Sequence, residues 1–382
     1  MDEGPANGPA AAVRLVEAAV EGGIVSAAVL AVGRGATDEG DLSVFGRTRL
    51  DTEGSPVTAD TLFDLASLTK VVATTPAVLR LADAGELGLD DPVARYLPAY
   101  SDGAKAEVTL RHLLTHSSGL PPHRAFDEVP GSVEQRLAAV AEEPLAAPPG
   151  TRVVYSDLGF ILLGAVVAKV AGAGLDRAAR DLVFDPLGMK STGYLPSAAP
   201  ERFAATEIRP ETGEPVIGTV HDENAAALGG VAGHAGVFGT VGDLVRYLRS
   251  GWLDQDCTFL SERGRTAALA CGTEGLDGRR GLGWTLAGDR WDHMTAAWPR
   301  TRAGHTGFTG TSLAFDPVSG LWTVLLTNAV HLGRDHSGIV LLRRTVHAAV
   351  AAWAETAGPR EAAAGAPGRA AGYDQPVRIQ GD

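Results

Sequence analysis

A serine and a lysine lie three residues apart at the start of a predicted helix. The segment Ser67-Leu68-Thr69-Lys70 opens a helical pattern over 67–84, which Gly85 ends. Positions i and i+3 share one face of a helix, so the Lys70 amine can reach the Ser67 hydroxyl. A serine hydroxyl needs a nearby base to act as a nucleophile, and a helix N-terminus favours a developing oxyanion. By itself the pair is a weak signal, because an N-capping serine followed by a solvated lysine has the same spacing.

Two further motifs lie far from this pair along the chain. Tyr155-Ser156-Asp157 follows Pro148-Pro149-Gly150 and precedes a predicted helix over 158–170. Its tyrosine is either a structural anchor or a phenol that shuttles protons beside a cationic amine. His305-Thr306-Gly307 lies on a strand-like run, where glycine allows a substrate backbone to lie against the strand.

In their order and spacing, the three motifs resemble those of the serine β-lactamase and penicillin-binding-protein superfamily. The tyrosine form of the middle motif is similar to that of the class C β-lactamase-like branch, which includes esterases, peptidases and transacylases. Residues 113–121 and 221–236 carry the same resemblance, so it spans about 61–328 of the chain.

The resemblance implies a role for each motif residue. Ser67 would be the nucleophile, Lys70 its general base or the partner of that base, and Tyr155 the group that passes a proton to the leaving group. The backbone N–H groups of Ser67 and Phe308 would form the oxyanion hole. The residues expected to contact the substrate are Asp157, His305, Thr306, Gly307 and His123.

Two positions depart from the pattern of the branch. Asp157 stands where asparagine is usual, and a carboxylate beside Lys70 favours the charged amine, which shifts the base role toward Tyr155. His305 stands where most β-lactamases have lysine, and an imidazole holds a substrate carboxylate less firmly than a permanent ammonium. Both changes argue against penicillins as the natural substrate and favour esters or amides that lack that carboxylate.

Strand-like runs occur near both ends of the chain, and the middle is helical. The predicted strands are 24–32, 41–50, 281–287, 312–315 and 321–327. The predicted helices are 9–21, 67–84, 110–115, 133–141, 158–170, 177–183, 240–250 and 338–354. Thr240 and Asp243 are spaced as a capping box for one of them.

This pattern predicts an α/β fold in which an antiparallel sheet is flanked by helices. The sheet domain is expected to be discontinuous, over 1–80 and 235–356, with a mostly helical domain over 81–234 inserted between its parts. A cleft between the two is the expected place for the site. Residues 357–382, which are rich in Ala, Gly, Pro and Arg, are predicted to be a disordered tail.

The net charge of −13 disfavours a nucleic-acid partner and an anionic membrane surface. No run of about 18 apolar residues is present, and Met1 to Gly8 lacks the basic and apolar regions of a signal peptide, so a cytoplasmic protein is expected. The two cysteines, Cys257 and Cys271, form no metal-binding pair.

No cofactor and no metal are expected. His112 and His116 have the i, i+4 spacing of a helical metal site, but no glutamate follows His112 as in metalloproteases. His221, Asp222 and His234 lie in glycine-rich sequence and are interpreted as loop residues with satisfied polar side chains.

The leading hypothesis is a serine hydrolase that cleaves a small ester or amide through an acyl-enzyme on Ser67. The first alternative is a transacylase of secondary metabolism, in which an amine or alcohol takes the acyl group. A cell-wall DD-peptidase or secreted β-lactamase ranks third, because both need export. A binding or sensor module that has lost turnover is the non-enzymatic alternative, and the intact Ser67, Lys70 and Tyr155 argue against it.

Overall fold

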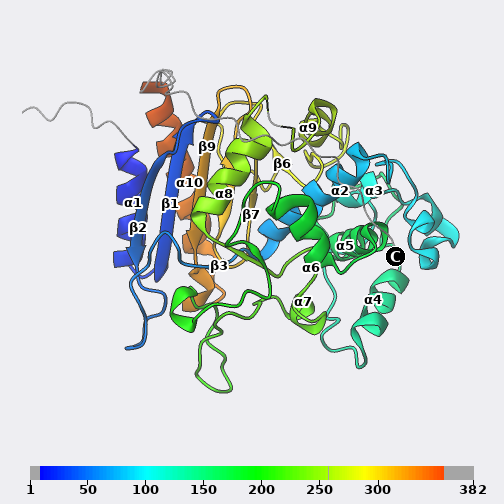
Figure 1. Ribbon diagram of the computed structural model, residues 1–382, viewed down its shortest axis with the longest axis horizontal. Helices are drawn as coiled ribbons and strands as arrows, with labels where there is room; N and C mark the ends of the chain where they lie inside the picture. Colours follow the sequence, from blue (N-terminus) through cyan, green and yellow to red (C-terminus); the bar gives the residue numbers. More distant parts are fainter. Residues whose placement is uncertain (1–8, 257, 357–382) are drawn as a thin grey trace, which may run out of the picture.

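The fold is built around an antiparallel sheet whose strands come from both ends of the chain. The computed structural model describes residues 9–256 and 258–356. Its main sheet has six strands in the order β2-β1-β9-β8-β7-β6. They are β1 (Ala27–Arg34), β2 (Asp41–Gly46), β6 (Thr285–Leu286), β7 (Ala303–Thr306), β8 (Ser312–Phe315) and β9 (Leu321–Thr327). The predicted α/β architecture is therefore confirmed (Figure 1).

Helices cover both faces of this sheet. α1 (Ala10–Glu21) and α10 (Ser337–Thr356) pack together on one face, and α8 (Val241–Leu248) packs on the other, against β1 and β9 (Figure 1). The side chains of β1 alternate accordingly: Ala28, Leu30 and Val32 join the core beneath α1 and α10, whereas Ala27, Val29 and Ala31 join the core beneath α8. Because both faces are covered, all six of these residues are apolar.

The remaining helices gather beside the sheet, in the right half of Figure 1. They are α2 (Thr75–Asp83), α3 (Leu110–Leu114), α4 (Val133–Glu142), α5 (Asp157–Ala171), α6 (Leu175–Ala179), α7 (Glu223–Ala227) and α9 (Glu262–Leu269). Short 3₁₀ turns occur at Ala66–Leu68, Val93–Arg95, Pro98–Tyr100, Gly103–Glu107, Pro200–Arg202 and Ala329–Leu332, and π-helical turns at Lys70–Thr74, Arg180–Phe184 and Arg249–Leu253. α5 lies in the middle of this region, with nine of its residues buried.

A second sheet, of three strands, was not predicted. Its strands are β3 (Phe63–Asp64), β4 (Gly193–Tyr194) and β5 (Val237–Gly239), with β5 in the middle. Runs of two or three residues are too short for an alternating pattern to be recognised in sequence. β3 ends two residues before Ala66, so this small sheet fixes the chain where it approaches Ser67.

Three local predictions were wrong in detail. The run predicted as a strand over 281–287 forms ladder pairs only at Thr285 and Leu286, in β6. The predicted capping box of Thr240 and Asp243 is not formed, because Asp243 instead accepts hydrogen bonds from Ser191 and Thr192. The predicted helix over 67–84 is not one continuous α-helix. The predicted tail, 357–382, lies outside the described residues.

Among the described helices, none is long and apolar enough by itself to cross a membrane. α5 and the segment 175–184 pass that test only jointly, as a pair bent by 80°.

Candidate active site

The chain enters the candidate site through a strained and firmly held turn. Ala66 has a φ of 46°, in the left-handed region that residues other than glycine seldom adopt. The buried carboxylate of Asp64 holds this turn, because it accepts hydrogen bonds from Ala66 N at 2.8 Å and from His221 N at 2.7 Å. Such strain persists only where the surroundings fix it, and it commonly marks a functional site.

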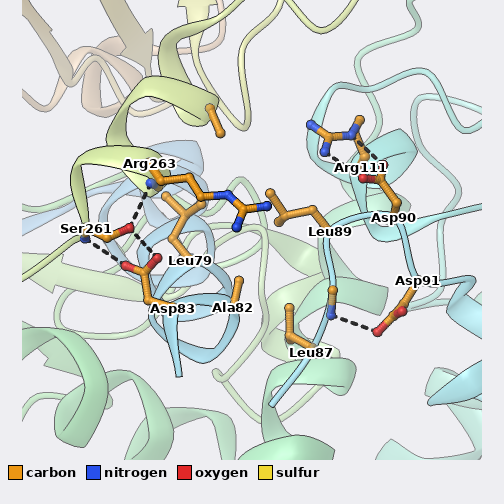
Figure 2. A pocket seen from close by; sticks show the side chains of 13 residues that line it. Leu79, Ala82, Asp83, Leu87, Leu89, Asp90, Asp91, Arg111, Ser261 and Arg263 are labelled. Atoms are coloured by element: carbon orange, nitrogen blue, oxygen red, sulfur yellow. Dashed lines mark hydrogen bonds and ion pairs between the residues drawn. The ribbon is translucent and has the colours of Figure 1, made fainter. Parts of the chain in front are cut away.

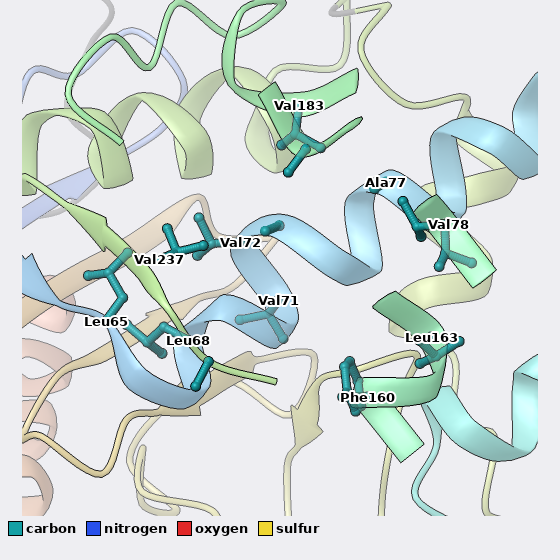
Figure 3. Packing of buried hydrophobic residues seen from close by; sticks show 14 of the residues in the cluster. Leu65, Leu68, Val71, Val72, Ala77, Val78, Phe160, Leu163, Val183 and Val237 are labelled. Carbon is teal, nitrogen blue, oxygen red and sulfur yellow. The ribbon is translucent and has the colours of Figure 1, made fainter. Parts of the chain in front are cut away.

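Ser67 lies in the 3₁₀ turn Ala66–Leu68, and Lys70 begins the π-helical turn Lys70–Thr74 that leads into α2. Leu68, Val71 and Val72 are buried and pack with Phe160 of α5 and Val237 of β5 in one core cluster, shown in Figure 3. The hydroxyl of Thr74 donates to Gly233 O at 2.6 Å. The segment is thus anchored on several sides, and the lysine is carried into the interior.

Lys70 is completely buried, and three oxygens lie close to its amine nitrogen, two as hydrogen-bond acceptors and one in an ion pair. Nζ lies 2.9 Å from Ser67 Oγ, 3.2 Å from the backbone oxygen of His234 and 2.7 Å from Asp157 Oδ1. An ammonium has three protons to donate and cannot accept. These distances therefore suit a protonated lysine that donates to Ser67 instead of taking its proton.

The charge on Lys70 is stabilised by its neighbours. Burial acts to lower the pKa of Lys70, but the Asp157 carboxylate and the Tyr155 phenol outweigh it, so the pKa of Lys70 is raised above its ordinary value. Asp157 therefore favours the charged form of Lys70, as the sequence predicted. Asp157 is the first residue of α5, where the helix dipole also favours a carboxylate.

Two cations lie near the ring of Tyr155. Lys70 Nζ is 5.0 Å from the centroid of its ring, and the guanidinium carbon of Arg280 is 5.8 Å from it. Arg280 is itself buried and paired with Asp289, at 3.1 Å. The ring of Tyr155, the predicted proton-transfer residue, thus lies close to two cationic side chains.

Two neutral histidines complete the surroundings of Tyr155. The rings of His116 and His305 have centroids 4.5 Å and 5.9 Å from that of Tyr155. Burial, together with the nearby cations, holds the pKa of both histidines well below the usual range. His116 Nδ1 accepts from Ser156 N at 3.0 Å, and His305 Nδ1 donates to Thr306 O at 2.9 Å. α3 ends at Leu114, before His116, so His112 and His116 do not share a helix face.

The motif around His305 reaches the segment before Ser67. A Cβ on Gly307 would lie 2.6 Å from Leu65 O and 2.2 Å from Thr311 Oγ1, so only glycine allows this approach. Thr306 is partly exposed and Phe308 is 46% exposed. Among the described residues, the backbone N–H of Phe308 donates to no backbone oxygen. The donor predicted for the oxyanion hole is therefore available.

His123 lies at the outer edge of the site. Its side chain is 51% exposed, and Nδ1 is 4.0 Å from Asp157 Oδ2 and 3.4 Å from Asn224 Nδ2. Asn224 also accepts from Phe126 N and donates to Arg124 O, so it holds the loop that carries His123. Printed distances thus link Ser67, Lys70, Asp157, Tyr155, His305 and His123 of the predicted site, with His305 buried and His123 exposed. The catalytic and substrate-binding roles of these residues stay predictions.

Sequence reasoning missed three supporting groups. Arg280 belongs to no motif, and Asn224 lies within 221–236, where the resemblance assigned it no role. The pair His234 and Asp222 is joined at 2.8 Å and fixes the carbonyl to which Lys70 donates. The proximity of these two residues in a glycine-rich loop was the available signal, and it was interpreted as structural. Within the described residues, no group of three or more His, Cys, Asp or Glu side chains is arranged to hold a metal.

A pocket of about 560 Å³ lies away from this site, between α2, the segment 87–91 and α9 (Figure 2). Ser67, Lys70 and Tyr155 are not among the residues that line it. Its serine, Ser261, donates to Asp83, and no histidine or lysine lines the pocket. It therefore offers no comparable chemistry.

Comparison with known proteins agrees with this geometry. A family model described as Beta-lactamase matches residues 12–347. The "Putative D-alanyl-D-alanine carboxypeptidase" of Escherichia coli (strain K12) is 36% identical over 309 residues, which cover 72% of this chain and 70% of that protein. The N-acetylmuramyl-L-alanine amidase of Bacillus subtilis (strain 168) is 33% identical over 304 residues, which cover 71% and 68%.

Solved structures share the fold. The LovD6 mutant of simvastatin synthase from Aspergillus terreus superposes with a TM-score of 0.72 at 24% identity, over 93% of this chain and 100% of that chain. The resemblance predicted from the three motifs is confirmed. Because the family model matches most of the chain and two relatives exceed 30% identity, this chain belongs to the beta-lactamase family.

Proposed function

We propose that this enzyme is a serine hydrolase that cleaves a carboxylic ester or amide through an acyl-enzyme on Ser67. The observation that carries the proposal is the contact of 2.9 Å between Lys70 Nζ and Ser67 Oγ, next to the strained turn at Ala66. A buried ammonium that donates to a serine oxygen stabilises the alkoxide character that this oxygen gains during attack.

Tyr155 is proposed as the base. Lys70 carries its full set of protons and donates them, so we propose that Tyr155 reacts as the phenolate and that its oxygen takes the proton of Ser67 as Oγ bonds to the carbonyl carbon. The electron pair of the carbonyl moves to its oxygen, which accepts from Ser67 N–H and Phe308 N–H. When the tetrahedral intermediate collapses, Tyr155 returns the proton to the leaving nitrogen or oxygen. Water then repeats the sequence and releases the acid.

An amide bond at an alanine residue is the first substrate class to test. The names of the two curated relatives both describe enzymes that cleave amide bonds at alanine. The neutral, buried His305 supports a substrate that is held by neutral hydrogen bonds instead of by a permanent ammonium. N-acetylmuramyl-L-alanine and D-alanyl-D-alanine peptides represent the two kinds of bond. A D-alanyl-D-alanine terminus carries a free carboxylate, so a neutral His305 makes it the less favoured of the two.

The test is a panel of these peptides, activated esters and β-lactams against the wild type and Ser67→Ala. Intact-protein mass spectrometry after treatment with a fluorophosphonate is expected to show one adduct, located on Ser67. Ser101→Ala, which changes an exposed serine elsewhere, serves as the control and keeps both the adduct and the activity. Full activity in Ser67→Ala, or an adduct on another residue, would overturn the proposal.

Hydrolysis and acyl transfer differ in the group that clears the acyl-enzyme. Turnover in the presence and absence of an added amine separates them, because transfer gives an amide product and a faster reaction. An acyl adduct that never clears under either condition would indicate a sensor module.

A further inference from the structure

Arg343 is a buried cation without a carboxylate partner among the described residues. It lies on α10, is 5% exposed, and forms no ion pair with the described residues. Burial, as the sole cause, lowers the pKa of Arg343 to about 9, so the guanidinium is still charged at neutral pH. Its Nε has no hydrogen-bond partner in the described part of the chain. A buried charge without a carboxylate partner lowers the stability of the fold. We therefore expect Arg343 to serve a function that offsets this cost.

The guanidinium is directed at the turn that carries the predicted oxyanion donor. Arg343 Nη2 donates to Gly307 O at 2.6 Å and to Thr311 O at 2.8 Å. Both oxygens belong to the connection between β7 and β8. Gly307 O and Phe308 N–H are the two ends of one peptide unit, and in a trans peptide they point in opposite directions. Fixing the oxygen toward α10 therefore directs the N–H away from α10.

We infer that Arg343 is a positioning residue that polarises the Gly307–Phe308 peptide, so that the Phe308 N–H becomes a stronger donor to the substrate oxyanion. Hydrogen bonds in series polarise one another, and a charged donor at the carbonyl end strengthens the donor at the amide end. The inference rests on the proposed function, in which Phe308 N–H holds that oxyanion.

A purely structural role does not account for the contacts. Gly307 O also accepts from Gly310 N at 3.1 Å, and Thr311 O also accepts from Gly307 N at 2.7 Å. Each carbonyl thus keeps a hydrogen bond without Arg343. Arg343→Met has a side chain of similar length and removes the cost of a buried charge, so we expect its melting temperature to equal or exceed that of the wild type.

The test uses an activated ester with a ¹³C-labelled carbonyl on the full-length wild type, Arg343→Met and the control Arg80→Gln. Arg80, which lies on α2, also donates to a backbone oxygen, but to that of Phe259 and not to the connection between β7 and β8. Isotope-edited infrared spectroscopy of the acyl-enzyme is expected to place the carbonyl stretch of Arg343→Met at higher wavenumber, because the oxyanion hole pulls less on it. The acylation rate is expected to fall about tenfold, less than when an oxyanion donor is removed.

The outcomes separate this inference from the proposed function. If the wild type forms no acyl-enzyme on Ser67, the proposed function fails. If it forms one and Arg343→Met leaves both the carbonyl stretch and the acylation rate unchanged, only the inference on Arg343 is overturned. A rate that falls together with the melting temperature, at an unchanged stretch, would assign Arg343 a structural role and also overturn it.

Discussion

Asp157 Oδ1 lies 2.7 Å from Lys70 Nζ, and this ion pair is enclosed between α5 and the segment that carries Ser67. The lysine side chain is fully buried, whereas 20% of the aspartate side chain is exposed. The Asp157 carboxylate thus compensates the charge of the Lys70 ammonium, which would lose its proton if it were buried without a partner. The pair explains how a lysine in the interior remains a cation beside the nucleophile.

Asp157→Asn should change the pH dependence of acylation. Asp157 raises the pKa of Lys70 against the effect of burial, so its removal lets burial dominate and the pKa of Lys70 falls. Lys70 then loses its proton at lower pH, and the site loses one negative charge. We expect the acidic limb of the kcat/KM profile to change and the alkaline limb to move to lower pH.

The measurement is kcat/KM for an activated ester between pH 5 and 10, a range of about five units around neutrality. Asp102→Asn, which neutralises an exposed aspartate far along the chain, is the control for net charge. A profile of Asp157→Asn that superposes on that of the wild type would remove Asp157 from the catalytic network.

Tyr155→Phe should lower kcat with little change in KM. Phenylalanine keeps the ring between Lys70, His116 and Arg280 but cannot exchange a proton. A positioned acid–base group contributes about 10²- to 10⁴-fold to the rate, and we expect a loss in that range. Tyr100→Phe is the matched control, since the buried hydroxyl of Tyr100 has no partner in the described part of the chain and its removal should leave activity unchanged. Equal kcat in Tyr155→Phe and the wild type would return the base role to Lys70.

Most of the fold was predictable because its strands carry regular patterns. β8 and β9 match their predicted bounds, since continuous apolar runs between turn residues leave little choice of boundary. The π-helical turn at Lys70 was not predictable, because hydrophobic spacing does not distinguish one extra residue per turn from ordinary helix. The missing capping box at Thr240 has a tertiary cause: Ser191 and Thr192 take up the Asp243 carboxylate.

The candidate site was predictable to the extent that its residues stand in short motifs. Ser67 and Lys70 are local in sequence, and the family resemblance placed Tyr155 and Phe308 beside them. Arg280 and Arg343 act through contacts with residues distant in sequence, and a lone arginine carries no local signal. The charge state of His305 likewise depends on burial, which no spacing pattern reports.

Gly307→Ala should reduce activity by more than any loss of fold stability accounts for. The added Cβ would lie 2.2 Å from Thr311 Oγ1 and 2.6 Å from Leu65 O, so the turn must move away from the segment before Ser67. A shift of this kind displaces the Phe308 N–H, and loss of an oxyanion donor costs about 10²- to 10³-fold in rate. Gly242→Ala is the control, because no atom lies within 4 Å of its added Cβ.

In α8 the substitution Gly242→Ala should stabilise the fold by about 0.5–1 kcal/mol, without loss of activity. Urea unfolding and kcat/KM measured on the same preparations compare the two variants. If Gly307→Ala retains wild-type kcat/KM, the close approach of this turn to the nucleophile has no catalytic role.

Glu207 should contribute stability that is lost in acid. Its carboxylate accepts from Arg334 Nε and Nη2 at 2.8 and 2.7 Å, and it lies 3.0 Å from Nε2 of His221, whose ring stacks on Phe308. The hydrogen bonds from Arg334 lower the pKa of Glu207 to about 2 from an ordinary value of 4.5. A carboxylate with a lowered pKa stabilises the fold fully above the unfolded value, so this contribution is present above pH 4.5 and disappears as the pH falls toward 2.

The free energy of unfolding in urea, measured at intervals from neutral pH down to the acid range, tests this for the wild type and Glu207→Gln. At neutral pH we expect a difference of about 1–2 kcal/mol, below what the full pKa shift implies because solvent screens a partly exposed pair. The difference should shrink as the pH falls from 4.5 toward 2, since protonated Glu207 and glutamine are then alike. Glu211→Gln, at an exposed position nearby, should follow the wild type throughout. A difference that stays constant across this range would show that Glu207 stabilises the fold by packing and not by charge.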